Sequence, residues 1–306
     1  MNIDSTYQLL INPSQEIILS FEPWLFNTEA YLNLWKSETI KFYWYNTISQ
    51  KADALLFLQK SEDNVWISPL RGTFAGIDCE KIFDITDFIE LLSIEIGNLN
   101  LDTVILKLTP CYFHKEHLPI LNSYFTNSNV EFTELNYHFN LDESLGLLHK
   151  SKRWRLNKLL NLDYVFENQK HENLDLIHQF ICNARNRKGF PMTISVEDFI
   201  QMINSIPDRY FLFTVKIKGE LAAVSVCVNL GKNVFYNLYS ADNERYLKDS
   251  PMILLYAGMY NYAFENHYKI LDLGISTYMG IRNEGLIQFK KSLGAIETEK
   301  HILRLL

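Results

Sequence analysis

The sequence predicts a two-domain α/β (α+β) protein, with each domain a mixed, mostly antiparallel sheet flanked by helices. The chain has 306 residues, which suits two domains of about 150 residues better than one core. The same order of strands and helices can be read twice along it, as a repeat of architecture and not of residues. The second reading ends on a strand, a helix and a strand, which indicates mixed pairing with buried parallel members.

The first half carries a degenerate version of the shared element order. Runs of alternating or apolar residues predict strands at 41–46, 54–59, 65–70, 103–108 and 130–140. Helical spacing of apolar residues predicts helices at 86–98 and from about 117 to 125. The pattern resets near Asp142-Glu143-Ser144, so we predict a first domain over residues 1–142 and a second over residues 143–306.

The second half gives the clearer pattern. A strand at 164–168 precedes helices at 173–187 and from Ser195, whose hydroxyl is suited to cap the helix. Strands at 210–218, 221–230 and 233–240 are joined by glycine-containing turns and predict an antiparallel meander. Then come a helix at 250–266, a strand at 270–273, a helix at 283–293 and a strand at 296–303.

Composition and charge exclude several classes of protein. With 47% hydrophobic and 21% charged residues, the chain is typical of a folded globular protein. No apolar run reaches the roughly 18 residues of a membrane span, and the opening residues lack a secretory pattern, so we expect a cytoplasmic protein. The net charge of −7 opposes non-specific nucleic-acid binding. The four cysteines are scattered, without a paired spacing, and we expect no metal site.

Several local motifs, in this order, resemble one acyltransferase family. They are Tyr239-Ser240-Ala241, Arg245-Tyr246-Leu247-Lys248, Ser250-Pro251, Leu271-Asp272-Leu273-Gly274 and Gln288-Phe289-Lys290-Lys291-Ser292-Leu293-Gly294-Ala295. Together with the element order they resemble the GNAT acyltransferase fold, and within it the FemAB-like branch, in which one chain carries tandem GNAT-like domains. The similarity covers the second half well and the first half mainly by architecture.

The resemblance implies where the chemistry would take place. In the GNAT fold two neighbouring strands splay apart to form a slot for the acyl group, and the resemblance puts this slot between strands 233–240 and 270–273. The residues that this implies for donor binding are Tyr236, Tyr239, Ser240, Arg245, Lys248 and Ser250.

Three residues are candidates for catalysis, each with a structural alternative. Asp272 would accept a proton or orient an amine, or else cap backbone donors at the end of its strand. Lys290 would donate to a developing oxyanion, a role that the resemblance supports, or else lie in solvent beside Lys291. Tyr278 would protonate a leaving group, or else serve as a packing residue with its hydroxyl in water.

The donor is open between acyl-CoA and aminoacyl-tRNA. Acetyl-CoA enzymes of the superfamily bind the pyrophosphate on backbone N–H groups at the start of the helix after the meander, helped by glycines. Here that segment, residues 245–251, has no glycine, carries Asp249, and loses one donor to Pro251. The sequence therefore favours an acyl-transfer site over one built specifically for acetyl-CoA.

The densest positive run opens the second domain and includes Lys152, Arg153 and Arg155. In FemAB-like proteins this stretch lies near the cleft, so these residues are candidates to bind an anionic acceptor or a tRNA end. The alternative is a solvated helix face.

The sequence thus predicts an acyl or aminoacyl transferase that joins an activated small-molecule donor to an amine acceptor. The alternative is a catalytically inactive binding or scaffold protein that keeps the GNAT fold. Hydrolase, NTPase and dehydrogenase fingerprints are absent. The sequence does not identify the acceptor or the oligomeric state.

Overall fold

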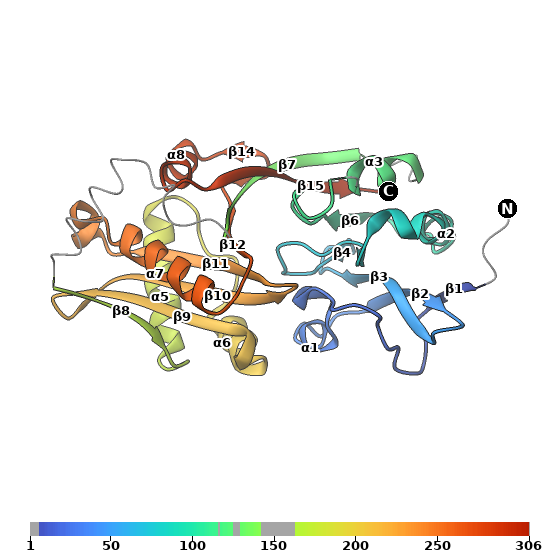
Figure 1. Cartoon of the computed structure of the whole chain (residues 1–306), viewed down its shortest axis with the longest axis horizontal. Helices are drawn as coiled ribbons and strands as arrows, with labels where there is room; N and C mark the ends of the chain where they lie inside the picture. The colour runs from blue at the N-terminus through green and yellow to red at the C-terminus, as the bar shows by residue number, and fades with distance from the viewer. Residues whose placement is uncertain (1–5, 116, 125–128, 142–162, 306) are drawn as a thin grey trace. The chain divides into compact units, whose positions relative to one another are not determined.

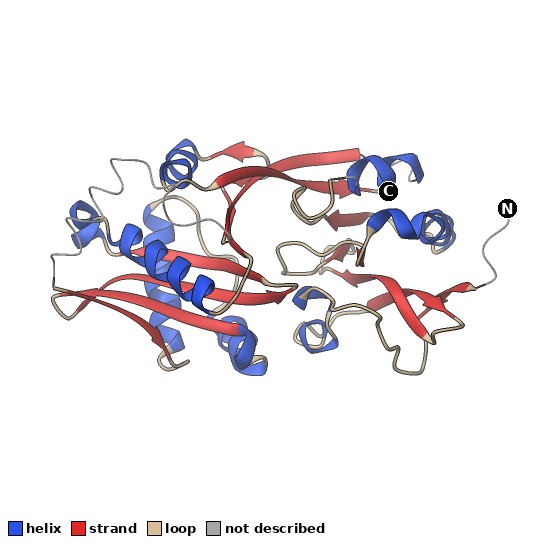
Figure 2. Cartoon of the chain, in the orientation of Figure 1, coloured by secondary structure: helices blue, strands red, loops and turns tan. Residues whose placement is uncertain are grey.

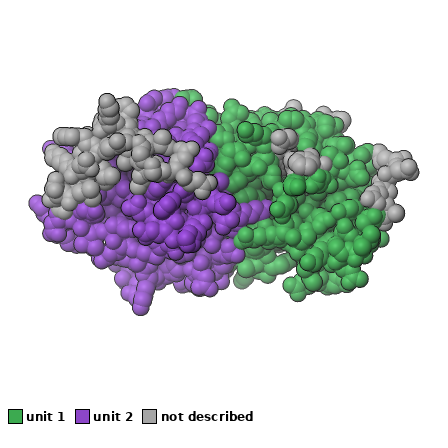
Figure 3. Space-filling model, viewed as in Figure 1, with its two compact units in different colours: residues 1–136, 277–282, 298–306 green, residues 137–276, 283–297 purple. Residues whose placement is uncertain are grey.

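The computed structural model describes residues 6–115, 117–124, 129–141 and 163–305. The chain forms two compact units (Figure 3). Unit 1 comprises residues 1–136, 277–282 and 298–306, and unit 2 comprises residues 137–276 and 283–297. The predicted domain boundary, between residues 142 and 143, falls at the edge of the segment 142–162, which lies outside the described residues.

Unit 2 contains the predicted meander. Its strands are β8 (Tyr164–Gln169), β9 (Tyr210–Ile217), β10 (Glu220–Gly231), β11 (Val234–Asp242) and β12 (Ile270–Ile275). They are ordered β12-β11-β10-β9-β8, and all neighbours are antiparallel except β11 and β12, which run parallel. The tight turn between β9 and β10 places Lys218 and Gly219 at positive φ, as a two-residue hairpin requires.

Helices cover both faces of this sheet. They are α5 (Leu174–Arg187), α6 (Val196–Ser205), the 3₁₀ helices η4 (Pro207–Arg209) and η5 (Glu244–Asp249), α7 (Pro251–Glu265) and α8 (Glu284–Ser292). α7 crosses one face of the strands and α5 lies on the other (Figure 1). The predicted cap of α6 is confirmed, because the Ser195 hydroxyl accepts a hydrogen bond from the N–H of Asp198 at 3.1 Å.

Unit 1 repeats the order of elements. Figure 2 shows helices in blue and strands in red along the whole chain. Its strands are β1 (Tyr7–Ile11), β2 (Thr39–Asn46), β3 (Lys51–Lys60), β4 (Trp66–Ser68), β5 (Asp78–Cys79) and β6 (Val104–Lys107). Its helices are η1 (Leu25–Asn27), α1 (Glu29–Leu32), η2 (Ile82–Ile85), α2 (Thr86–Asn98) and α3 (His117–Tyr124). β2, β3 and β4 are antiparallel, whereas β4 and β6 pair in parallel over three residues, as β11 and β12 do in unit 2. This match supports the predicted tandem fold.

Two long strands pass from the residues of one unit to those of the other. They are β7 (Asn129–Asn140) and β15 (Ile296–Arg304). Within unit 1, the C-terminal part of β15 pairs antiparallel with β6, with Ile302 opposite Lys107. The last elements are a hairpin of β13 (Thr277–Tyr278) and β14 (Ile281–Arg282). Among the described residues, no helix combines the length and apolar character of a membrane span.

Candidate functional site

The site is built where the parallel ladder of β11 and β12 ends. Tyr236 opposite Asp272 is the last of its three residue pairs, although both strands continue, to Asp242 and to Ile275. The strand pair in which we expected the slot therefore stops pairing at two of the predicted site residues.

Gly274 allows the backbone to turn near the end of β12. Its φ of +71° is one that only glycine adopts readily, and its N–H donates to Oδ1 of Asp272 at 2.7 Å. A Cβ at this position would lie 3.0 Å from the Tyr236 hydroxyl oxygen. The glycine thus permits a sharp turn directly against β11. Asp272 is fully buried and caps this turn, the structural role that we weighed against catalysis.

Lys290 is the most unusual side chain at this end of the ladder. It is 2% exposed, and its Nζ donates to the carbonyl oxygens of Gly274 at 2.8 Å and Ile275 at 2.9 Å. Burial lowers the pKa of this amine to about 7, and the negative charge of Asp272 opposes that fall. Lys290 is therefore buried against the turn, so the alternative of a solvated lysine is wrong.

Tyr137, a neighbour of Lys290, and Glu297, a partner of Tyr137, were not among the predicted site residues. The Lys290 Nζ lies 5.6 Å from the ring centroid of Tyr137, a cation–π distance. The Tyr137 hydroxyl donates to the Glu297 carboxylate, which also pairs with Lys291 at 2.9 Å. These residues lie far apart in the sequence, and neither belongs to a motif that sequence reasoning could have used.

A β-bulge in β11 forms a second polar cluster. Opposite β10, Cys227 pairs with Asn237 and Val226 with Tyr239, so that Leu238 is the extra residue. The bulge brings Asn237 and Ser240 to one face, where the Asn237 Nδ2 donates to Ser240 Oγ at 3.4 Å.

That cluster is buried against α7. The Asn237 Nδ2 also donates to Tyr256 Oη at 3.0 Å, and its Oδ1 accepts from Ser225 Oγ at 2.7 Å. The next residue back along the strand from Ser240, Tyr239, packs instead on Phe199 of α6, with ring centroids 6.3 Å apart. The predicted donor residues Tyr239 and Ser240 thus point to opposite faces of the sheet.

The predicted donor loop is held by its own ion pairs. Arg245 is an exposed residue in the first turn of η5, and its guanidinium pairs with Glu220 at 3.1 Å. Lys248 is exposed, and Ser250 adopts a left-handed conformation directly before α7. Pro251 is the first residue of α7, so the expected loss of one N–H donor at this helix start is confirmed.

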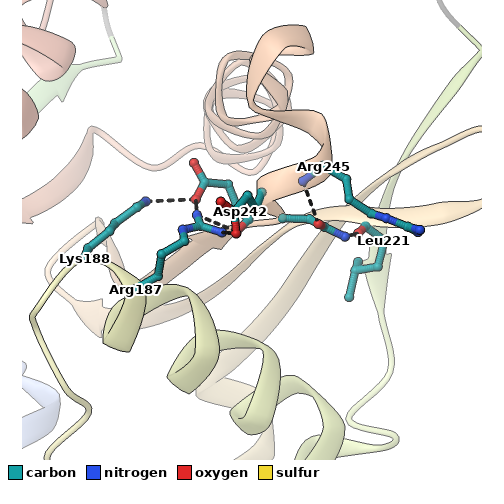
Figure 4. Close-up of polar contacts among 7 residues, drawn as sticks. Arg187, Lys188, Leu221, Asp242 and Arg245 are labelled. Atoms are coloured by element: carbon teal, nitrogen blue, oxygen red, sulfur yellow. Dashed lines mark hydrogen bonds and ion pairs between the residues drawn. The ribbon is translucent and has the colours of Figure 1, made fainter.

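The start of this loop is fixed to the end of α5 (Figure 4). The Asp242 carboxylate accepts from Arg187 at 3.0 Å and from Lys188 at 2.8 Å. Beyond it, the Asn243 side chain bridges the N–H of Arg245 and the carbonyl of Leu221. Asp242 thus joins the end of β11 to the end of α5, and the next residue, Asn243, is joined to β10 and η5.

Four further residues were predicted for the site, Tyr278, Lys152, Arg153 and Arg155. Tyr278 is at the exposed tip of the β13–β14 hairpin in unit 1, with 59% of its surface accessible. Lys152, Arg153 and Arg155 lie outside the described residues. Among the residues that the structure does describe, no three His, Cys, Asp or Glu side chains are grouped in a way that would suit a metal ion.

Comparison with known proteins finds a domain model that matches part of the chain and solved structures that share its fold. Residues 149–291 match the family described as an acetyltransferase (GNAT) domain. FemX superposes with a TM-score of 0.70 at 12% identity, over 90% of this chain and 91% of FemX. No curated protein matches the sequence significantly.

Two further solved structures share the fold over most of the chain. The C-terminal domain of a putative lysylphosphatidylglycerol synthetase from Agrobacterium fabrum gives a TM-score of 0.57 at 11% identity, covering 87% of this chain and 84% of that one. A tandem GNAT protein from the clavulanic acid biosynthesis pathway gives 0.53 at 7% identity, covering 88% and 82%. Residues 149–291 are therefore similar to a GNAT acetyltransferase domain, and the chain as a whole has the tandem, FemAB-like fold of these structures.

Proposed function

We propose that this protein transfers an acyl or aminoacyl group from an activated donor to an amine, at the end of the β11–β12 ladder, with Lys290 stabilising the oxyanion. The observation that carries the proposal is the buried amine of Lys290, which is held by two carbonyl groups at that point. An ammonium group has three donors. Two are used by Gly274 and Ile275, and the third is left to meet an oxygen of the substrate.

The reaction follows from this arrangement. The neutral nitrogen of the acceptor attacks the acyl carbon, and the carbonyl oxygen gains negative charge as the C–N bond forms. A preorganised N–H in a buried site stabilises that charge strongly. Collapse of the adduct breaks the bond from the acyl carbon to the leaving group, a thiolate or a sugar alkoxide. The proton that the amine loses balances the one that this leaving group takes up to become a thiol or a hydroxyl.

A pKa of about 7 suits Lys290 to this role near neutral pH. The buried carboxylate of Asp272 favours the protonated, donating form of the amine. We assign Asp272 a positioning role, since its carboxylate accepts from the N–H of Gly274 and so fixes the turn. Its negative charge also stabilises the positive charge of Lys290.

The donor class is the open part of the proposal. A loop without glycine, bearing Asp249 and Pro251, disfavours a pyrophosphate on the backbone at the start of α7. The names of the structural neighbours support both donor classes. One neighbour is a tandem GNAT protein studied without AcCoA, and another is a synthetase named for lysylphosphatidylglycerol. We therefore propose an acyl-CoA or an aminoacyl-tRNA.

The test is a transfer assay with a panel of acyl-CoA and aminoacyl-tRNA donors. Lys290→Met is compared with Lys291→Met, a matched change at the next residue, whose side chain is 46% exposed. We expect Lys291→Met to retain transfer and Lys290→Met to lose about 100-fold or more. Equal rates in both variants would refute the assigned site. If no donor is used and none raises the melting temperature, the protein is a scaffold.

A further inference from the structure

One face of α5 carries three polar side chains outside the site described above. His178, Cys182 and Arg185 follow one another at helical spacing and so share a face. The His178 ring lies 5.3 Å from that of Phe199, which in turn packs against Tyr239 of β11. The charge of Arg185 acts on both the Cys182 thiol and the Tyr239 hydroxyl, so these groups form one cluster.

The hydrogen bonds of this cluster show where two of its protons lie. The His178 Nε2 lies 3.0 Å from the carbonyl oxygen of Ile194, which can only accept, so this nitrogen carries the proton. The Cys182 Sγ lies 3.6 Å from Nδ1 of His178, and the thiol donates to the Met192 Sδ at 3.8 Å. Burial raises the pKa values of Cys182 and Tyr239 and keeps both protonated. One side chain of this cluster, a guanidinium, is a permanent cation.

Arg185 is that cation, and its charge has no balancing acid in the described part of the chain. Its Nε is buried without a hydrogen-bond partner there, and no carboxylate of the described residues forms an ion pair with it. The two neighbouring cations differ, since Arg187 and Lys188 both bind Asp242. A buried guanidinium N–H without a partner is costly, and a bound water or anion would satisfy it.

We propose that Arg185 and Tyr239 bind a carboxylate group on the amine acceptor, an inference that rests on the transfer activity proposed above. A guanidinium presents two parallel N–H donors that match a planar carboxylate, and the Tyr239 hydroxyl supplies a further donor. Both side chains are partly exposed, so a ligand can reach them. A single cation suits a ligand group with one negative charge. A phosphate carries more charge and would need further cations, but the neighbouring Arg187 and Lys188 are already paired with Asp242.

Calorimetry with the full chain tests this without requiring turnover. The probes are glycine, β-alanine and glycylglycine, each compared with its amide, and inorganic phosphate. We expect at least one carboxylate probe to bind the wild type about tenfold or more tightly than its amide. Arg185→Gln should lower that affinity by about tenfold or more, whereas Lys188→Gln, which removes the same charge from the same end of α5, should change it by less than about twofold.

Three results would overturn the inference. In the first, Arg185→Gln binds the carboxylate probe as tightly as the wild type does. In the second, the wild type binds acid and amide equally well. In the third, the wild type binds no carboxylate probe, even if it binds phosphate. If Arg185→Gln does not fold, Arg185→Lys can be used instead. It keeps the positive charge but lacks the two parallel N–H donors of the guanidinium, so it should bind the carboxylate probe several times more weakly than the wild type. Binding that depends on Arg185 in a protein that transfers nothing would reject the proposed function alone. Transfer that is equally fast to acids and amides would reject this inference alone.

Discussion

Replacing Lys290 by methionine should remove a large pH dependence of the protein's stability. Burial lowers the pKa of this amine from 10.5 to about 7, whereas in the unfolded chain it keeps its ordinary value. Between these two pH values the unfolded state binds one proton more than the folded state, so the free energy of unfolding rises with pH. At about 1.36 kcal/mol per pKa unit, the full effect is on the order of 5 kcal/mol.

The accessible part of this effect can be measured by urea unfolding. From about pH 7 to about pH 9 the wild type should gain about 2 kcal/mol of unfolding free energy relative to Lys290→Met, because the folded lysine is half protonated at the start and neutral at the end. Other titrating groups are shared by both proteins and cancel in the difference. Lys291→Met, with its side chain 46% exposed, should titrate like the wild type.

The same urea measurements can refute the low pKa of Lys290. If wild type and Lys290→Met gain or lose the same stability over this range, Lys290 is an ordinary lysine with a high pKa, and its burial at the end of the ladder is misassigned. The methionine side chain is close in length and apolar, so the comparison tests the charge more than the packing.

Three further changes test the surrounding geometry. Gly274→Ala should lower the free energy of unfolding by about 1–2 kcal/mol, because alanine is strained in the left-handed conformation of this residue. The new Cβ would also crowd the Tyr236 hydroxyl. An unchanged urea midpoint would contradict this expectation. Asp272→Asn keeps an acceptor for the turn but removes the charge that favours protonated Lys290, so the Lys290 pKa measured by NMR should fall below about 7, and a rise would contradict it. Asp242→Asn should cost about 1–2 kcal/mol, since its two cations remain partly solvated, and thermal unfolding that matches the wild type would exclude any such contribution.

Much of unit 2 could be predicted because its signals are local. The hydroxyl of Ser195, placed before two acids and an apolar stripe, is enough to define the start of α6. The apolar strand around Asp272 and the helix of Lys290 were predicted within one or two residues of their observed bounds. For the same reason, α2 in unit 1 was predicted with the bounds that it has.

Other details of the site could not be predicted, because they depend on contacts that leave no pattern in the local sequence. A one-residue bulge at Leu238 reverses the alternation of β11, so the faces of Tyr239 and Ser240 could not be read from the sequence. Tyr137 and Glu297 meet only because β7 and β15 both contribute residues to unit 2. The short elements β1, α1 and β5 escaped prediction because their apolar runs are too brief to show a period.

The most direct test of the account is the pH dependence of the transfer rate in single turnover. The acceptor should be an amine that is already unprotonated at about pH 6, so that only groups of the protein titrate. If protonated Lys290 stabilises the oxyanion, the rate falls as pH rises through about 7, the pKa of this amine, and the fall is absent from the residual rate of Lys290→Met. A rate that stays level or rises through this pH in the wild type would contradict the assigned role of Lys290.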